Sequence, residues 1–159
     1  MKKILSLVLA FTMVLCLGSC AGNENLTAKE VSNAFDGCSG TLSLETSGNS
    51  VTSFTYVVED IYASDLVDKD FSINAMNTVA SGDTGSITRN QLKVCEAILA
   101  MISVEALLGD EDSSFSSDDL LEKVLGVICD GNTAKYEGWS VSAEVDQAYD
   151  LITITAVAE

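Results

Sequence analysis

One segment near the middle of the chain constrains the fold most, because it predicts a helix that has to be buried. Thr88 and Gln91 have the spacing of a capping box, which opens a helix, and Gly109 ends it. Apolar residues cover most of the circumference of this helix: Leu92, Val94, Cys95, Ile98, Leu99, Met101, Ile102, Val104 and Leu108. Such a helix belongs in a protein core, so the rest of the chain must pack around it.

Two further helices are predicted, one on each side of this segment. Thr27 and Glu30 form a capping box that opens a helix before Asp36-Gly37, where the glycine allows a left-handed turn. Ser117 is placed to cap another helix, which ends at Asp130-Gly131. Both helices therefore end at an Asp-Gly pair.

Alternating apolar and polar residues predict the strands. The segments with this pattern are residues 41–44, 51–59, 71–79, 139–146 and 151–158. In the last strand we expect Ile152 and Ile154 to face the core. A register shifted by one residue would instead bury Leu151, Thr153 and Thr155. Residues 62–70 predict one helical turn.

These elements predict an α+β fold, with an antiparallel sheet of about four to five strands and two to three helices packed on one face. Residues 27–159 are expected to form a single globular domain. The order helix, Asp-Gly, hairpin occurs at residues 27–59 and again at 117–158. Because few residues match between the two units, two interpretations stay open: an internal duplication, or a common way of ending a helix.

The first twenty residues have the pattern of an export signal. Lys2 and Lys3 precede an uncharged apolar run of 14 residues, from Ile4 to Leu17, and a Gly-Ser-Cys sequence follows at 18–20. A helix of that length spans about 21 Å, whereas the apolar core of a bilayer is about 30 Å thick. A stable transmembrane helix is therefore not expected here.

The sequence Leu17-Gly18-Ser19-Cys20 resembles the lipobox of bacterial lipoproteins, and residues 1–19 resemble their signal peptide. The resemblance implies cleavage between Ser19 and Cys20 and acylation of Cys20 with a two-chain lipid such as palmitate. Residues 20–26 would form a lipidated tether at the extracytoplasmic face of the cell membrane. The alternative is an ordinary cleaved signal in which Cys20 has no role, and the type of cell envelope stays open.

Charge restricts the partners of the chain. It has 8 basic and 24 acidic residues, and loss of Lys2 and Lys3 with the signal would leave a net charge near −18. This charge repels the phosphates of nucleic acids, so we expect no nucleic-acid partner. The remaining partners are the bilayer itself, through acylated Cys20, and an unidentified protein or neutral ligand. The acidity also has a simpler interpretation, which is solubility.

The chain contains no histidine, so a Ser-His dyad, an imidazole base and a histidine-based zinc or haem site are excluded. Of its five cysteines, Cys16 belongs to the signal and Cys20 to the lipobox. Three remain, which permits one internal disulfide at most. Cys95 lies in the apolar central helix, so the favoured pair is Cys38 with Cys129. The alternative is three reduced thiols.

An acidic link offers a weak candidate for a metal site. Asp110, Asp112, Ser114 and Asp118 lie at alternating positions between two helices, which resembles the front of a calcium-binding helix-loop-helix. Phe115 and Leu121 stand where that loop requires glycine and a bidentate glutamate. We therefore interpret the link as a solvated loop and expect neither a metal nor a cofactor.

Other acidic motifs indicate no catalytic site. Asp65, Asp68 and Asp70 lack the context of a glycosidase pair or a metal motif, and we interpret them as a solvated face. A single Asp-Thr-Gly at 83–85 resembles the motif of aspartic proteases, but it lacks the apolar residues before it and a second copy. We interpret it as a turn.

Aromatic residues near the final hairpin suggest a contact patch made of Tyr136, Trp139 and Tyr149, although core packing is the alternative.

The sequence as a whole predicts a membrane-anchored extracytoplasmic lipoprotein that is not an enzyme and acts as a binding or scaffolding domain. The alternatives are a small envelope hydrolase that uses carboxylates and a protein inhibitor module.

Overall fold

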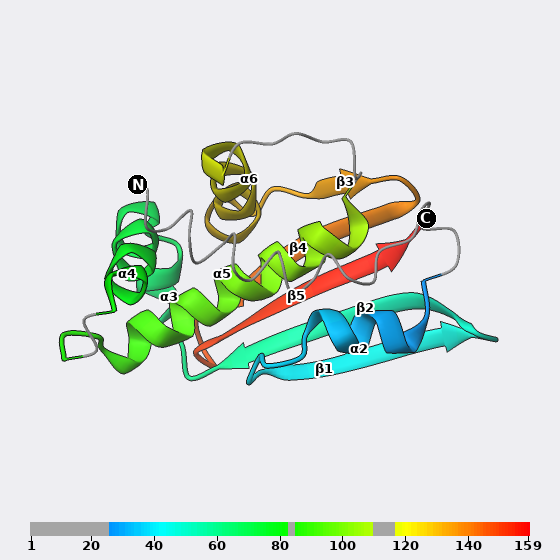
Figure 1. Cartoon of the computed structure of the whole chain (residues 1–159), viewed down its shortest axis with the longest axis horizontal. Coiled ribbons are helices and arrows are strands. Elements are labelled where there is room, and N and C mark those ends of the chain that lie inside the picture. Colours follow the sequence, from blue (N-terminus) through cyan, green and yellow to red (C-terminus); the bar gives the residue numbers. More distant parts are fainter. Residues whose placement is uncertain (1–25, 83–84, 110–116) are drawn as a thin grey trace.

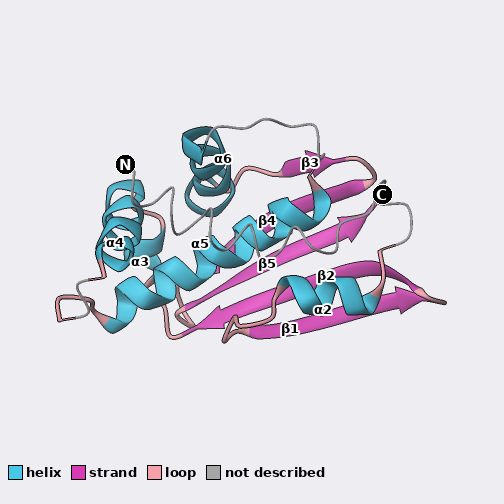
Figure 2. Cartoon of the chain, in the orientation of Figure 1, coloured by secondary structure: helices cyan, strands magenta, loops and turns pink. Residues whose placement is uncertain are grey.

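The protein has two layers, an antiparallel sheet and a group of helices on one of its faces (Figures 1 and 2). The computed structural model describes residues 26–82, 85–109 and 117–159. The helices are α2 (Ala28–Ala34), α3 (Ala63–Leu66), α4 (Lys69–Ser81), α5 (Arg89–Leu108) and α6 (Ser117–Asp130). The strands are β1 (Thr41–Ser47), β2 (Ser50–Glu59), β3 (Ala134–Tyr136), β4 (Trp139–Asp146) and β5 (Leu151–Ala158). The predicted α+β class is confirmed.

The two predicted capping boxes are both present. At the start of α2, the Thr27 backbone N–H donates to Glu30 Oε2 at 2.8 Å, and Thr27 Oγ1 accepts from the Glu30 N–H. These hydrogen bonds from Thr27 lower the pKa of the Glu30 carboxyl. Thr88 and Gln91 make the same reciprocal pair at the start of α5. Local sequence therefore determines where both helices begin.

The strand predicted at residues 71–79 is wrong, because this segment belongs to helix α4. The Asp68 side chain accepts hydrogen bonds from the backbone N–H groups of Asp70 and Phe71, which caps the helix. Ala75 and Met76 are buried on the face that packs against α5. The β-branched and aromatic residues of this segment favour a strand locally, and the cap and tertiary packing override that preference.

The described part of the chain contains five helices, more than the two or three predicted, because α4 replaces a strand and α3 is the short turn expected at residues 62–70. The sequence also did not predict β3, which has three residues and pairs with the first residues of β4.

The strand order is β1-β2-β5-β4-β3, and every neighbouring pair is antiparallel. The two long hairpins meet at the centre through β2 and β5. Ile152 and Ile154 of β5 have no exposed surface, which confirms the predicted register. At the β1 edge, the pairing with β2 shifts between Glu45 and Thr46, which is a β-bulge.

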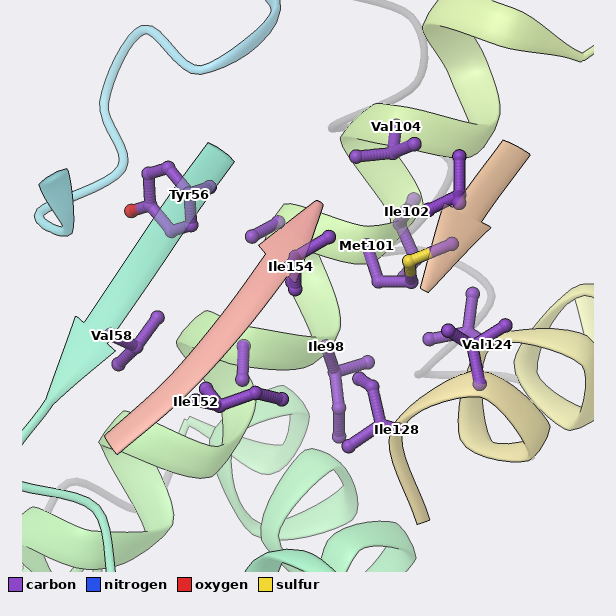
Figure 3. Close-up of a cluster of buried hydrophobic side chains, with 14 of the residues drawn as sticks. Tyr56, Val58, Ile98, Met101, Ile102, Val104, Val124, Ile128, Ile152 and Ile154 are labelled. Carbon is purple, nitrogen blue, oxygen red and sulfur yellow. The ribbon is translucent and has the colours of Figure 1, made fainter. Parts of the chain in front are cut away.

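Helix α5 lies along the inner face of the sheet, and α2 and α6 flank it (Figure 1). Figure 3 shows Ile98 and Met101 of α5 between the strand residues Ile152 and Ile154 and the α6 residue Ile128. Beyond these aliphatic residues, aromatic rings extend the core toward β1 and β4. Their centroid distances are 4.8 Å for the stacked pair Phe35–Tyr56 and 5.9 Å for Phe54–Trp139. One continuous core thus joins both hairpins to α5.

We expect Ile154→Ala to lower the free energy of unfolding by about 2–5 kcal/mol, because it leaves a cavity at the centre of this core. The neighbouring Thr155 is on the opposite face of β5, so Thr155→Ala should cost less than about 1 kcal/mol. Urea denaturation followed by circular dichroism measures both. Equal losses would contradict the observed register.

Candidate functional site

The three aromatic residues of the predicted contact patch are separated in the structure. Trp139 is 2% exposed and packs on Phe54 in the core. Tyr149 is 76% exposed and lies in the β4–β5 turn. Trp139 begins β4 and the turn follows its end, so about 23 Å of strand separates them. The two residues therefore belong to different environments, and only Tyr149 is available for contact.

Tyr136, the third residue of the patch, is part of a polar cluster between β3 and the helices. Its hydroxyl donates a hydrogen bond to Glu105 Oε2, and Lys123 Nζ lies 2.7 Å from Glu105 Oε1. The same ammonium lies 4.4 Å from the centre of the Tyr136 ring. Burial and the neighbouring Glu105 raise the pKa of the Tyr136 hydroxyl. The cluster neutralises a carboxylate that is only 8% exposed, so we assign it a structural role.

The cysteines in the described part of the chain are free thiols. Cys38 lies near Tyr56 and Glu96, whereas the Cys129 thiol donates to the Leu66 carbonyl at 3.2 Å. The disulfide predicted between Cys38 and Cys129 is not formed, because each thiol packs against a different part of the helical layer. Cys95 is buried in α5, as its apolar surroundings predict.

The acidic candidates do not form a site in the described residues. Asp110, Asp112 and Ser114 of the predicted calcium loop lie outside those residues, and Asp118 is exposed in the first turn of α6. Asp68 instead caps α4. Within residues 26–82, 85–109 and 117–159, no three Cys, Asp or Glu side chains are grouped so that they could hold a metal ion.

The outer face of the sheet, opposite the helices, is lined with hydroxyl groups. Strand alternation places eight Ser and Thr side chains there: Thr41, Ser43, Ser53, Thr55, Ser140, Ser142, Thr153 and Thr155. All are exposed or half-buried. Ser43, Thr55, Thr155 and Ser142 form one row across four strands. This face is largely polar, and among the described helices those that contact the sheet pack on its other side.

One end of the sheet carries exposed aromatic rings on an ordered backbone. We call this surface the tyrosine end and define it by Asp60, Tyr62, Leu92, Tyr149 and Asp150. Tyr62 is 62% exposed, Tyr149 76% and Leu92 51%. The segments that carry the two rings are joined by a backbone hydrogen bond of 2.9 Å, from the N–H of residue 61 to the carbonyl of Asp150.

The first turn of α5 fixes this surface from one side. Arg89 Nη2 lies 2.7 Å from Asp60 Oδ2. Asn90 Oδ1 accepts from the Tyr62 backbone N–H at 2.9 Å, and its Nδ2 donates to Asp65 Oδ2 at 2.6 Å. These contacts order the chain around Tyr62 without covering its ring.

The sequence indicated Tyr149 but not Tyr62, and the prediction that Leu92 belongs to the buried apolar stripe of α5 is wrong, because Leu92 is exposed. The sequence did locate Leu92 along the helix, because the capping box at Thr88 places it just after the first turn of α5. No local sequence signal indicates that Tyr62 is exposed, because its exposure depends on how α3 follows β2.

Comparison with models of known protein families, with curated proteins and with solved structures finds no match to this chain. None of the helices in the described residues has the length and apolar character required to cross a bilayer.

We expect Tyr136→Phe to lower the free energy of unfolding by about 1.5–3 kcal/mol, because it removes a hydrogen bond to a buried carboxylate. Tyr149→Phe, the matched change at an exposed ring, should leave stability unchanged within about 0.5 kcal/mol. Chemical denaturation of both variants tests this, and equal stabilities would show that the Tyr136–Glu105 contact is unimportant.

Stability should fall at alkaline pH. Burial raises the pKa of the Cys95 thiol from 9.0 to about 12, and it also raises the pKa values of Cys38, Cys129, Tyr56 and Tyr136. A raised folded-state pKa stabilises the fold below the unfolded-state value, and this contribution is lost as pH rises toward the folded-state value.

Between pH 9 and 11, Cys95 alone should therefore reduce the free energy of unfolding by up to about 1.4 kcal/mol per pH unit. Urea titrations under reducing conditions at several pH values measure this slope. The Cys95→Ala variant should show a shallower slope, whereas an unchanged slope would mean that Cys95 does not titrate with a raised pKa.

Proposed function

We propose that the chain is a lipid-anchored extracytoplasmic protein that acts as a non-enzymatic binding or scaffolding domain at the cell membrane. The observation that carries the proposal is the sequence Leu17-Gly18-Ser19-Cys20, preceded by a basic and then an apolar segment. Acylation of Cys20 with two chains would provide stable anchoring, since each buried CH₂ contributes about 0.8 kcal/mol.

The start of the folded domain supports close attachment to the membrane. Leu26 is buried, and its carbonyl accepts a hydrogen bond from the Val51 N–H at 2.7 Å. Residues 20–26 extend over at most about 25 Å. In the proposed state, the end of the sheet near Val51 would therefore lie near the lipid surface.

The surfaces of the domain favour contact over turnover. The hydroxyl-lined face and the tyrosine end both present side chains outward on a well-packed scaffold. The buried acidic group, Glu105, is neutralised by Lys123 and Tyr136, and Asp68 is used in a helix cap. Binding through an exposed surface accounts for these features better than acid–base chemistry does.

The anchor is tested by metabolic labelling with an alkyne fatty acid, followed by membrane fractionation. The wild-type protein should be labelled and should fractionate with membranes. Cys20→Ala should lose the label and the membrane association, while Cys16→Ala, within the apolar run, should retain both. A labelled Cys20→Ala protein, or an unlabelled wild-type protein, would contradict the proposal.

A further inference from the structure

We infer that the tyrosine end is a docking surface for a basic, apolar segment of a partner protein. This inference rests on the proposed binding function and names the surface and the chemistry of the partner.

Exposed apolar side chains gather at this end of the molecule. Six large hydrophobic residues of the described chain are exposed: Tyr62, Val67, Ile73, Leu92, Tyr149 and Val157. All except Val157 belong to α3 and its flanks, to α4, to the start of α5 or to the β4–β5 turn. These segments lie together at the left of Figure 1. Tyrosine is among the residues that contribute most to protein interfaces, so the concentration is informative.

The surface is held in place before any partner binds. Asp60 and Asp150 have φ values of 59° and 51° and are the only non-glycine residues with positive φ in the described chain. This conformation is unfavourable for an ordinary residue and less so for aspartate. The two residues are held by the Arg89 ion pair and by the hydrogen bond between residues 61 and 150. Strained backbone supported in this way is common at binding sites.

Charge at this end favours a basic partner. Glu59 and Asp146 lie in one row of the outer face beside the turn, on either side of Leu151, and Asp150 lies within the turn. In the described chain no Lys or Arg forms an ion pair with any of these three carboxylates. Arg89 pairs with Asp60 instead. A segment with Lys or Arg would meet these acids, and its guanidinium or ammonium groups could also stack on the tyrosine rings.

The position of the surface suits a protein partner away from the lipid. Leu26, the last residue of the proposed tether, accepts a hydrogen bond from Val51 at the start of β2, and Tyr62 follows the end of that strand. β2 has 10 residues, which corresponds to about 30 Å. The tyrosine end is thus at the opposite end of the sheet from the start of β2 (Figure 1).

The chain contains four tyrosines, and this allows a test with internal controls. The full chain, labelled with 3-fluorotyrosine and held in nanodiscs of zwitterionic lipid, is titrated with an octapeptide of alternating Arg and Leu. We expect the ¹⁹F resonances of Tyr62 and Tyr149 to shift while those of Tyr56 and Tyr136 stay in place. Tyr62→Phe and Tyr149→Phe each remove one resonance and so assign the spectrum. Empty nanodiscs correct for binding of the peptide to lipid.

Variants then separate binding from folding. Tyr62→Ala combined with Tyr149→Ala should weaken peptide binding at least tenfold with an unchanged melting temperature, because both rings are exposed. Glu59→Gln should weaken binding about two- to threefold. Val157→Ala, the exposed apolar residue outside this end, should have no effect.

Several outcomes would overturn the inference. The first is that the resonances of Tyr62 and Tyr149 do not shift, and the second is that all four tyrosine resonances shift equally. The third is that a matched peptide of alternating Glu and Leu, or of alternating Arg and Ser, binds as tightly as the Arg-Leu peptide. Stronger shifts of the same two resonances with chitohexaose would assign the surface to a glycan instead. Because anchoring is measured separately through Cys20, a failed titration with a labelled, membrane-bound protein rejects this docking surface and leaves the anchor intact.

Discussion

The burial of α5 against one face of the sheet is the interaction on which the rest of the structure depends. The helix contributes eleven buried residues, contacts α2, α4, α6 and β2, and shares one core with both hairpins, so it unites segments that are far apart in the sequence. The position of α5 also determines which face of the sheet is apolar and which is polar. Apolar residues of the strands face the helical layer, and Ser and Thr are the most frequent of the alternate residues on the outer face. The polarity of that face follows from the strand period once the inner face is occupied.

Elements defined by local signals could be predicted from the sequence. The capping boxes of α2 and α5 are formed by neighbouring residues, and the register of β5 follows from the alternation of Ile152 and Ile154. Helix α4 could not be predicted, because its local preference for strand is overridden by the Asp68 cap and by packing against α5. Strand β3 was missed because three residues carry no period.

Candidate sites were predicted less well than the fold, for a physical reason. The type of a residue does not indicate whether its side chain is buried: Trp139 fills the core, Tyr136 neutralises Glu105, and Tyr149 is exposed. Exposure depends on long-range contacts, such as the one that orders Tyr62 through Asn90, which lies 28 residues further along the chain. The separation of Cys38 from Cys129 has the same origin, since their similar local sequences lie against different helices.

In the proposed membrane-anchored state, the bulge at the β1 edge would affect how neighbouring copies behave. Confinement to a surface raises the local concentration of a protein, and an open sheet edge is then a template for pairing with the next copy. At the bulge, Thr52 is the extra residue of β2, and its hydroxyl donates to the carbonyl of Glu45. The Glu45 side chain adds negative charge to the same edge. Irregular geometry and like-charge repulsion together oppose the addition of a strand at this edge, so closely spaced copies would resist pairing through β1.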